Sequence, residues 1–169
     1  KEISKQLIAK NHEVVWLSRH PGSNSLNIKE YHWDTDKGTM DKDALEGVDT
    51  IINMAGAPIS ERWTPAYKSE IIRSRVDSIR LLFTVIQKNK FPVKSFISAS
   101  AVGYYPHDYH REFTEDSPPG KDFLSLVCQK WEQEVKHFKS LDIRTARCRI
   151  GIVLSELGGA LPEIAKPIK

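Results

Sequence analysis

Residues 50–58 read Thr-Ile-Ile-Asn-Met-Ala-Gly-Ala-Pro, and this stretch, together with the segment up to residue 98, decides the fold. Its first four residues are a short apolar run that predicts a strand, which passes into a turn of small residues. Thr64 and Pro65 then predict a helix start, because the hydroxyl can cap the helix and proline at its first position loses no hydrogen bond. Apolar residues recur at helical spacing up to about Asn89, and a second strand is predicted at 96–98. This order of strand, helix and strand predicts a parallel βαβ unit.

The rest of the chain extends the same alternation. A continuous apolar run at 14–17 predicts a strand buried on both faces, as in a parallel sheet. Further strands are predicted at 28–33 and 146–154, and helices at 1–10, 41–45 and 122–139. Together these elements predict an α/β protein with a doubly wound, mostly parallel sheet covered by helices. Ligands of such sheets bind beyond the carboxyl ends of the strands, so candidate site residues are sought there.

The composition excludes several other classes of protein. The 169 residues carry 25 Lys and Arg against 22 Asp and Glu, a net charge of +3 without the basic block typical of nucleic-acid binders. No apolar run approaches the ~20 residues of a membrane span, and the mean hydropathy is −0.43. Cys128 and Cys148 have neither a disulfide-scaffold nor a zinc spacing, which favours a reducing compartment. We therefore expect a cytoplasmic globular protein that binds neither nucleic acid nor membranes.

Polar and small residues gather at the predicted strand ends and are candidates for nucleotide binding. Arg19 comes directly after the first predicted strand, where arginine accommodates the 2′-phosphate of NADP and an acidic residue would instead bind NAD. An arginine in a surface loop is more often only solvated, and the small residues 55–57 fit a tight turn equally well. The candidates for cofactor binding are Ser18, Arg19, Asp34, Asn53, Ala55, Gly56, Ala57, Ser98 and Arg149.

A second group of side chains has catalytic potential. Ser100 ends a predicted strand, where its hydroxyl could polarise a substrate carbonyl or only cap a turn. Tyr104 and Tyr105 come soon after it and could supply phenols or aromatic packing. Cys128 lies on the apolar stripe of a predicted helix, where a lone cysteine is most often inert.

Two further patterns have weaker claims. His107 and His110 have an HxxH spacing, but they lie in a proline-rich loop with no helix to align them, so no metal site is expected. The pair Gly158 and Gly159 fits a hinge, an anion-binding turn or an ordinary turn.

Several short motifs stand in a distinctive order along the chain. They are Asn-Met-Ala-Gly-Ala-Pro-Ile at 53–59, Arg-Trp-Thr-Pro at 62–65, Ser-Arg-Val at 74–76, Ile-Ser-Ala-Ser-Ala-Val-Gly-Tyr-Tyr at 97–105, Asp-Phe-Leu-Ser at 122–125, Val-Cys-Gln at 127–129, Trp-Glu at 131–132 and Arg-Ile-Gly-Ile-Val-Leu at 149–154. Together they resemble the extended short-chain dehydrogenases/reductases, and more closely an atypical group of epimerase family proteins described as nucleoside-diphosphate-sugar epimerases. The resemblance implies an NADP(H)-binding Rossmann domain at 1–155, without its first strand and glycine-rich turn, and the start of a substrate-binding region at 156–169.

The same resemblance implies the candidate catalytic residues. Ser100 matches the active-site serine of the superfamily. Leu124 and Cys128 stand where its Tyr-x-x-x-Lys pair would lie, and Arg75 stands where a helix asparagine would. Leucine has no proton to give, and a cysteine cannot act on a neighbouring phenol as a lysine ammonium does. We therefore expect Tyr104 or Tyr105 to replace the lost acid, with Cys128 assisting. Arg75 or Arg62 is expected to hold an anionic group of the substrate.

The sequence supports two hypotheses about function. The first is an NADP(H)-dependent oxidoreductase or epimerase that acts on a hydroxyl or carbonyl substrate such as a nucleotide sugar, with NAD the less favoured cofactor. The second is a catalytically inactive NADP(H)-binding sensor or scaffold, because both residues of the Tyr/Lys pair are missing. Extended relatives pair through two long helices, so a homodimer through the helices at about 65–89 and 122–139 is a further expectation.

Overall fold

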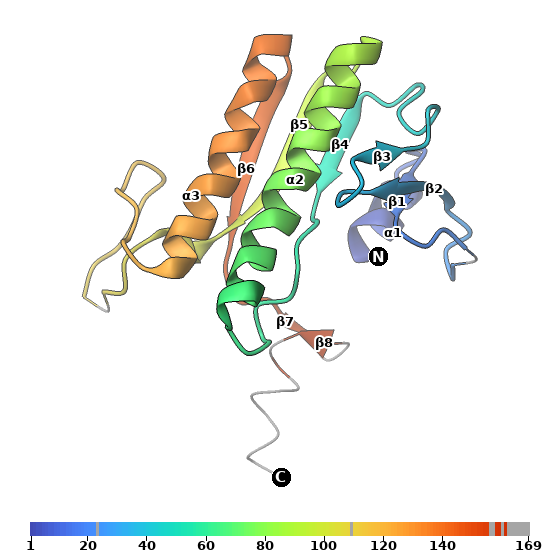
Figure 1. The fold of residues 1–169 in the computed structure, drawn as a ribbon. Helices are drawn as coiled ribbons and strands as arrows, with labels where there is room; N and C mark the ends of the chain where they lie inside the picture. Colours follow the sequence, from blue (N-terminus) through green and yellow to red (C-terminus); the bar gives the residue numbers. More distant parts are fainter. Residues whose placement is uncertain (23, 109, 156–157, 160, 162–169) are drawn as a thin grey trace.

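The computed structural model describes residues 1–22, 24–108, 110–155, 158–159 and 161. Its strands form two three-stranded sheets, of order β1–β2–β3 and β4–β5–β6, and a small pair β7–β8 (Figure 1). β2 runs parallel to β1, and β4, β5 and β6 run parallel to one another, whereas β3 is antiparallel to β2 and β8 to β7. The strands are Val15–Ser18 (β1), Lys29–Asp34 (β2), Thr39–Met40 (β3), Thr50–Asn53 (β4), Ser95–Ala101 (β5), Arg144–Ile150 (β6), Leu154–Ser155 (β7) and Gly158–Gly159 (β8).

The predicted βαβ unit is confirmed and is followed by a second one. Helix α2 (Pro65–Asn89) connects β4 to β5, and helix α3 (Phe123–Lys136) leads through the 3₁₀ helix η2 (His137–Leu141) into β6. Thr64 and Asp122 cap the two helices, because the side chain of each accepts a backbone N–H of the first turn. Figure 1 shows α2 and α3 side by side across one face of the second sheet.

The hydrophobic core lies between β4–β5–β6 and these two helices. Phe96 of β5 stacks on Phe138 of η2 with ring centroids 4.0 Å apart, and Phe83 of α2 meets Phe138 edge-on at 5.5 Å. Phe96 and Phe138 are completely buried. Because side chains alternate along a strand, Ala146 and Cys148 of β6 point to the opposite face, where both are exposed. The packing that stabilises this sheet is therefore on its helical face.

The first sheet differs from the prediction in two places. The helix predicted at 41–45 is wrong, because residues 42–47 form successive turns. Asp41 is tied to β2 by its backbone N–H and its carboxylate, which bond the carbonyl and the amide of His32, and Gly47 turns the chain with a φ of +72°. β1 is half-buried and not buried on both faces, because in the described part of the chain only β2 pairs with it.

The two sheets are separate in hydrogen bonding. β4 is bonded to β5 as β1 is to β2, and among the described residues no strand pairing joins the two sheets. Helix α1 (Glu2–Ala9) lies beside the first half, where the hydroxyl of Ser4 accepts the indole N–H of Trp16 at 3.0 Å (Figure 1). None of the described helices is long and apolar enough to cross a lipid bilayer.

The last predicted strand ends earlier than expected. β6 stops at Ile150, and Leu154–Ser155 pairs instead with Gly158–Gly159, so these glycines lie in a strand pair and not in a turn. Most of residues 156–169, predicted to begin a substrate-binding region, lie outside the described residues.

Candidate functional site

The loop after β4 is fixed to helix α2 by two side chains. Asn53, at the end of β4 and buried, donates from Nδ2 to the hydroxyl of Ser78 at 3.4 Å and accepts the backbone N–H of Ala55 at 3.2 Å. The backbone N–H of Ala57 donates to the hydroxyl of Ser74 at 2.9 Å. These bonds hold the predicted small-residue turn at the carboxyl end of the sheet.

Gly56, in the middle of this loop, lies directly against a neighbouring arginine. A Cβ at Gly56 would lie 2.9 Å from Cζ of Arg75 on α2, which is closer than side-chain atoms pack. Arg75 donates from Nη1 to the carbonyl of Ile71 in its own helix, and its Cζ lies 5.1 Å from the ring centroid of Trp131 on α3. Burial lowers the pKa of the Arg75 guanidinium, although an arginine stays charged at neutral pH. The glycine thus makes room for a half-buried positive charge.

The most tightly bonded cluster centres on Glu132 of α3, which is only 4% exposed. Its Oε1 accepts the hydroxyl of Ser100 at 2.7 Å and Nε of Arg149 at 2.8 Å, and its Oε2 accepts Nη2 of Arg149 at 2.9 Å. The register of β5 and β6 places Ser100 opposite Arg149. Burial by itself would raise the pKa of Glu132, but the hydrogen bonds from Arg149 and Ser100 outweigh it and lower the pKa. Glu132 is therefore an ionised carboxylate with its acceptors in use.

Two tyrosines enclose the guanidinium of Arg149. Nη1 of Arg149 donates to the hydroxyl of Tyr105 at 2.8 Å and to the carbonyl of Glu115 at 2.9 Å, and Cζ lies 3.6 Å from the ring centroid of Tyr104. Tyr104 ends the 3₁₀ helix η1 (Val102–Tyr104), which comes directly after β5. In this structure Glu132 neutralises the charge of Arg149 and engages two of its donors, and the cofactor role expected of Arg149 stays a prediction. Within the described residues, the hydroxyl of Tyr104 has no hydrogen-bond partner.

Glu132 was missed as a candidate by the sequence interpretation. The signal that could have found it is its position four residues after Cys128 on the apolar stripe of α3, between Trp131 and Val135. A carboxylate on a buried stripe requires a counter-charge, because an unpaired charge there is too costly. The sequence has several arginines, and only the tertiary structure shows that Arg149 is the partner.

Cys128 and Leu124, at the positions of the missing Tyr/Lys pair, do not reproduce its chemistry. Cys128 is 4% exposed, and its thiol donates to the carbonyl of Ala101 at 3.8 Å. Burial raises the pKa of the Cys128 thiol, so the group is neutral near pH 7. Leu124 is half-buried, with its Cβ packed toward Gly103. The assisting role predicted for Cys128 stays a prediction.

The remaining nucleotide-binding candidates divide between the two sheets. Ser18 ends β1 and is half-buried, and Arg19 beside it is exposed. Asp34 ends β2, where its carboxylate accepts two backbone N–H groups of the following turn, and the hydrogen bond from Lys37 lowers the pKa of Asp34. Ser98 of β5 is completely buried and donates to the carbonyl of Ala99, so its hydroxyl does not reach the strand ends. The structure therefore leaves Ser18 and Arg19 in contact with solvent at the end of β1 and encloses Ser98.

The two histidines of the HxxH pattern lie on the surface. His107 and His110 are exposed, and Nε2 of His107 lies 3.9 Å from a carboxylate oxygen of Asp122. Across the residues that the structure describes, no three His, Cys, Asp or Glu side chains come together as metal ligands.

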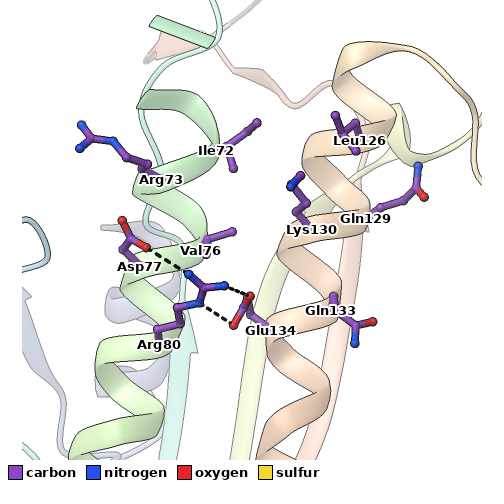
Figure 2. A pocket seen from close by; sticks show the side chains of 10 residues that line it. All are labelled: Ile72, Arg73, Val76, Asp77, Arg80, Leu126, Gln129, Lys130, Gln133 and Glu134. Atoms are coloured by element: carbon purple, nitrogen blue, oxygen red, sulfur yellow. Dashed lines mark hydrogen bonds and ion pairs between the residues drawn. The ribbon is translucent and has the colours of Figure 1, made fainter. Parts of the chain in front are cut away.

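A groove of about 630 Å³ runs between α2 and α3 on their outer side, and not at the strand ends where the site residues gather (Figure 2). Across it, Arg80 donates from Nε and Nη2 to the two carboxylate oxygens of Glu134 at 3.0 and 2.7 Å, and Asp77 lies 3.9 Å from Nη1 of Arg80. The groove is lined by Ile72, Arg73, Val76, Asp77, Arg80, Leu126, Gln129, Lys130, Gln133 and Glu134. The pairing of two copies through these helices stays a prediction.

Residues 1–123, which include β4, the loop of Gly56, α2 with Arg75, and β5, match the model of the NAD dependent epimerase/dehydratase family. The chain belongs to this family. The resemblance that the motifs indicated is thus confirmed.

Its relatives include several epimerase family proteins of bacteria. Protein SSP1921 of Staphylococcus saprophyticus is 34% identical over 98% of this chain, and YfhF of Bacillus subtilis is 37% identical over 96% of it. The chain covers 55% and 54% of these proteins, so it spans about half the length of the curated relatives it matches.

Solved structures of this family confirm the NAD(P)-binding Rossmann fold. The human epimerase family protein SDR39U1, solved with NADPH, is 29% identical with a TM-score of 0.78, and the match covers 98% of this chain and 54% of that protein. The nucleoside-diphosphate sugar epimerase of Corynebacterium glutamicum is 32% identical with a TM-score of 0.78, covering 96% of this chain and 33% of that one. The UDP-glucuronic acid 4-epimerase of Bacillus cereus, solved with NAD, shares the fold at 15% identity, with a TM-score of 0.74 over 97% of this chain and 56% of that chain.

Proposed function

We propose that this epimerase family protein is an NADP(H)-dependent oxidoreductase or epimerase that acts on a hydroxyl or carbonyl substrate, including a nucleotide sugar. One observation carries the proposal. Tyr104 lies at the carboxyl end of β5 with its ring held at 3.6 Å by the Arg149 guanidinium, while its own hydroxyl has no partner among the described residues. A positioned phenol at the strand ends of a Rossmann sheet is suited to donate a proton or hydrogen bond to a reacting oxygen.

The residues present at the strand ends fit a dinucleotide. The loop at 55–57 has no side chain beyond a methyl group, so a ligand can approach its backbone closely. Arg19 is exposed after β1 and has no carboxylate within ion-pair distance among the described residues, which supports a phosphate role and hence NADP. The solved human relative contains NADPH. The nicotinamide would supply hydride transfer, and the chain would bind, orient and protonate.

Tyr104 is a better candidate for the acid than the other residues considered. The hydroxyl of Ser100 already donates a hydrogen bond to Glu132 at 2.7 Å, so we assign to Ser100 the positioning of this carboxylate rather than proton donation to the substrate. The Cys128 thiol is buried and donates to a carbonyl, and Leu124 carries no proton. Arg149 orients the Tyr104 ring through its face.

The alternative is an NADP(H)-binding module without catalytic activity. The observation that favours it is the buried, neutral thiol of Cys128 in the position where the superfamily carries lysine. In that case Tyr104 would be a packing residue on Arg149. The two proposals agree on cofactor binding and differ on turnover.

The experiment uses the protein in the full length that its gene encodes. Calorimetric titration with NADPH and NADH tests binding, and NADPH oxidation is followed with a panel of aldehydes, ketones and nucleotide sugars. The proposal expects tighter binding of NADPH than of NADH and a Tyr104→Phe variant that loses ~100-fold or more in kcat with little change in NADPH affinity. Tyr31→Phe, a half-buried tyrosine of β2, is the matched control and should retain its rate.

Four outcomes test the two proposals. Turnover by the wild type that is lost in the Tyr104→Phe variant supports the proposal that the protein is an enzyme. NADPH binding without oxidation of any panel member supports the module, and turnover unaffected by Tyr104→Phe removes the role given to Tyr104. Absence of NADPH binding contradicts both.

A further inference from the structure

We infer that Arg75 is the receptor for an anionic group of the substrate, a carboxylate or a phosphate, at the carboxyl end of the sheet. The inference deepens the proposed function and rests on it, because it names the class of carbonyl or hydroxyl compound that the site takes. The charge pairing of Arg75, the contacts of its guanidinium and its position in the fold support it.

Arg75 differs from the other arginines of α2 in its charge pairing. Arg73 bonds Glu70 at 2.6 Å and Arg80 bonds Glu134 at 2.7 Å, and both of these arginines are exposed. Arg75 is more buried than either, yet within the described part of the chain no carboxylate lies within ion-pair distance of it. A charge removed from water without a partner is costly, so the least solvated arginine of this helix is the one that most needs a counter-ion.

The contacts around Arg75 supply too few acceptors. Nη1 donates to the Ile71 carbonyl, which leaves the other N–H groups of the guanidinium fork without an acceptor among the described residues. The Trp131 ring under the guanidinium offers only its π face, and its own indole N–H is buried with no hydrogen-bond partner in the described structure. The groups that interact with Arg75 electrostatically are the thiol of Cys128 and the phenol of Tyr67, and neither is a carboxylate. This neighbourhood is therefore rich in donors and poor in acceptors.

Arg75 lies at the carboxyl end of the second sheet, near the Glu132 cluster. Its guanidinium is packed against Gly56, an exposed residue of the loop after β4, so a ligand at the strand ends can reach it. It also lies over the ring of Trp131, the residue before Glu132 on α3. Arg19, the residue expected to hold the 2′-phosphate of the cofactor, belongs to the other sheet. We therefore assign the anion at Arg75 to the substrate, and an unchanged NADPH affinity in Arg75→Met would distinguish it from the pyrophosphate of the cofactor.

The chemistry of the guanidinium sets the ligand class. Its planar fork binds the two oxygens of a carboxylate or phosphate in parallel, which an ammonium cannot do. The substrate is accordingly a carbonyl or hydroxyl compound with such a group close to the reacting carbon.

The test measures anion binding in the full-length protein saturated with NADPH. Calorimetric titrations use oxamate as the carboxylate probe, inorganic phosphate as the phosphate probe and neutral oxamide as the uncharged control. Arg75→Met should lower the affinity for the anion by roughly 10-fold or more, as expected for the loss of charge-assisted hydrogen bonds. Arg75→Lys should recover part of the affinity, because the charge remains and the fork is lost.

Two further variants separate a specific site from general electrostatics. Gly56→Ala changes no charge but places a methyl group against Cζ of Arg75. It should therefore lower the affinity for the anion by displacing the guanidinium. Arg73→Met, two residues away on the same helix and exposed, removes one positive charge and should leave anion affinity unchanged. Circular dichroism of each variant confirms folding, and Gly56→Ala and Arg75→Lys keep the test valid if Arg75→Met does not fold.

The outcomes are distinct. Binding of only oxamate or only phosphate that depends on Arg75 supports the inference and identifies the anionic group as a carboxylate or a phosphate. Equal affinity in the wild type and Arg75→Met, or binding of neither anion by the wild type, overturns it, and so does a loss of NADPH affinity in Arg75→Met, because Arg75 would then serve the cofactor. If the protein binds no NADPH, the proposed function fails separately, while Arg75-dependent anion binding to the cofactor-free protein would still support an anion site.

Discussion

Replacing Glu132 by glutamine should destabilise the fold far more than the same change at Glu134, two residues further along α3. Glu132→Gln keeps the shape of the side chain and an acceptor for Ser100, but it removes the charge opposite Arg149, whose side chain is only 16% exposed. Loss of one partner of a buried ion pair costs ~3–5 kcal/mol. We expect a loss of unfolding free energy near the lower end of this range, about 3 kcal/mol, because the amide oxygen of glutamine can still accept a hydrogen bond and Arg149 is partly exposed.

Glu134 provides an unusually close comparison. It also forms two hydrogen bonds to one arginine, but Arg80 is 62% exposed and the pair lies in the solvent-facing groove of Figure 2. Solvent screening limits such a pair to less than about 1 kcal/mol. The two substitutions therefore change the same residue type, on the same helix, with the same kind of partner. The carboxylates are similarly buried, at 6% and 12% exposure, and the pairs differ in the exposure of the arginine.

The assay is thermal and urea unfolding of the chain followed by far-ultraviolet circular dichroism. For a chain of this size we expect a fall in Tm of roughly 6–12 °C for Glu132→Gln and less than about 4 °C for Glu134→Gln. The double variant Glu132→Gln/Arg149→Met should lose less than the sum of its single variants, because no uncompensated charge remains. Equal losses for Glu132→Gln and Glu134→Gln would refute the claim that burial sets the strength of the Glu132–Arg149 pair.

Two further predictions concern acid stability and helix capping. The pKa of Glu132 in the folded protein is lowered from its ordinary 4.5, so its contribution to stability is present above that value and is lost as the pH falls through the lower folded pKa. Below about pH 4.5 the wild type should therefore lose stability more steeply than Glu132→Gln. Urea titrations at successive pH values measure this, and parallel curves for the two proteins would contradict it. Thr64→Ala removes the hydroxyl that caps α2 and should lower the free energy of unfolding, measured in urea, by ~1 kcal/mol. Ser69→Ala, at an exposed position of the same helix, is the control and should be neutral. Equal effects of the two substitutions would mean that the cap contributes nothing.

The elements that the sequence predicted well are those with local causes. The start of α2 at Pro65 is explained by the Thr64 cap, and the strand Thr50–Asn53 by a short apolar run bounded by small residues. The helix predicted at 41–45 failed because a hairpin between β2 and β3 competes for this segment, and the bonds of Asp41 to His32 depend on a strand nine residues earlier. The local sequence pattern does not show whether this segment forms a helix or the turns that follow the β2–β3 pairing.

The candidate site shows the same division. Ser100, Tyr104, Arg149 and Arg75 were all selected from sequence, and the structure brings the first three into one cluster. Their partner Glu132 was not selected from sequence, and it determines which of them are available. It accepts the hydrogen bond of the Ser100 hydroxyl and neutralises the charge of Arg149.

The sequence by itself determined the order of strands and helices, the helix caps and the gathering of polar and small residues at strand ends, because each depends on neighbours along the chain. Only the tertiary structure decided which charges are matched. Arg149 and Arg75 are alike in sequence, but α3 brings Glu132 to the first, and it sets Trp131 and Cys128, which carry no counter-charge, beside the second. The physical reason is that solvation and charge pairing depend on distance in space, which the packing of α2 and α3 against the sheet sets.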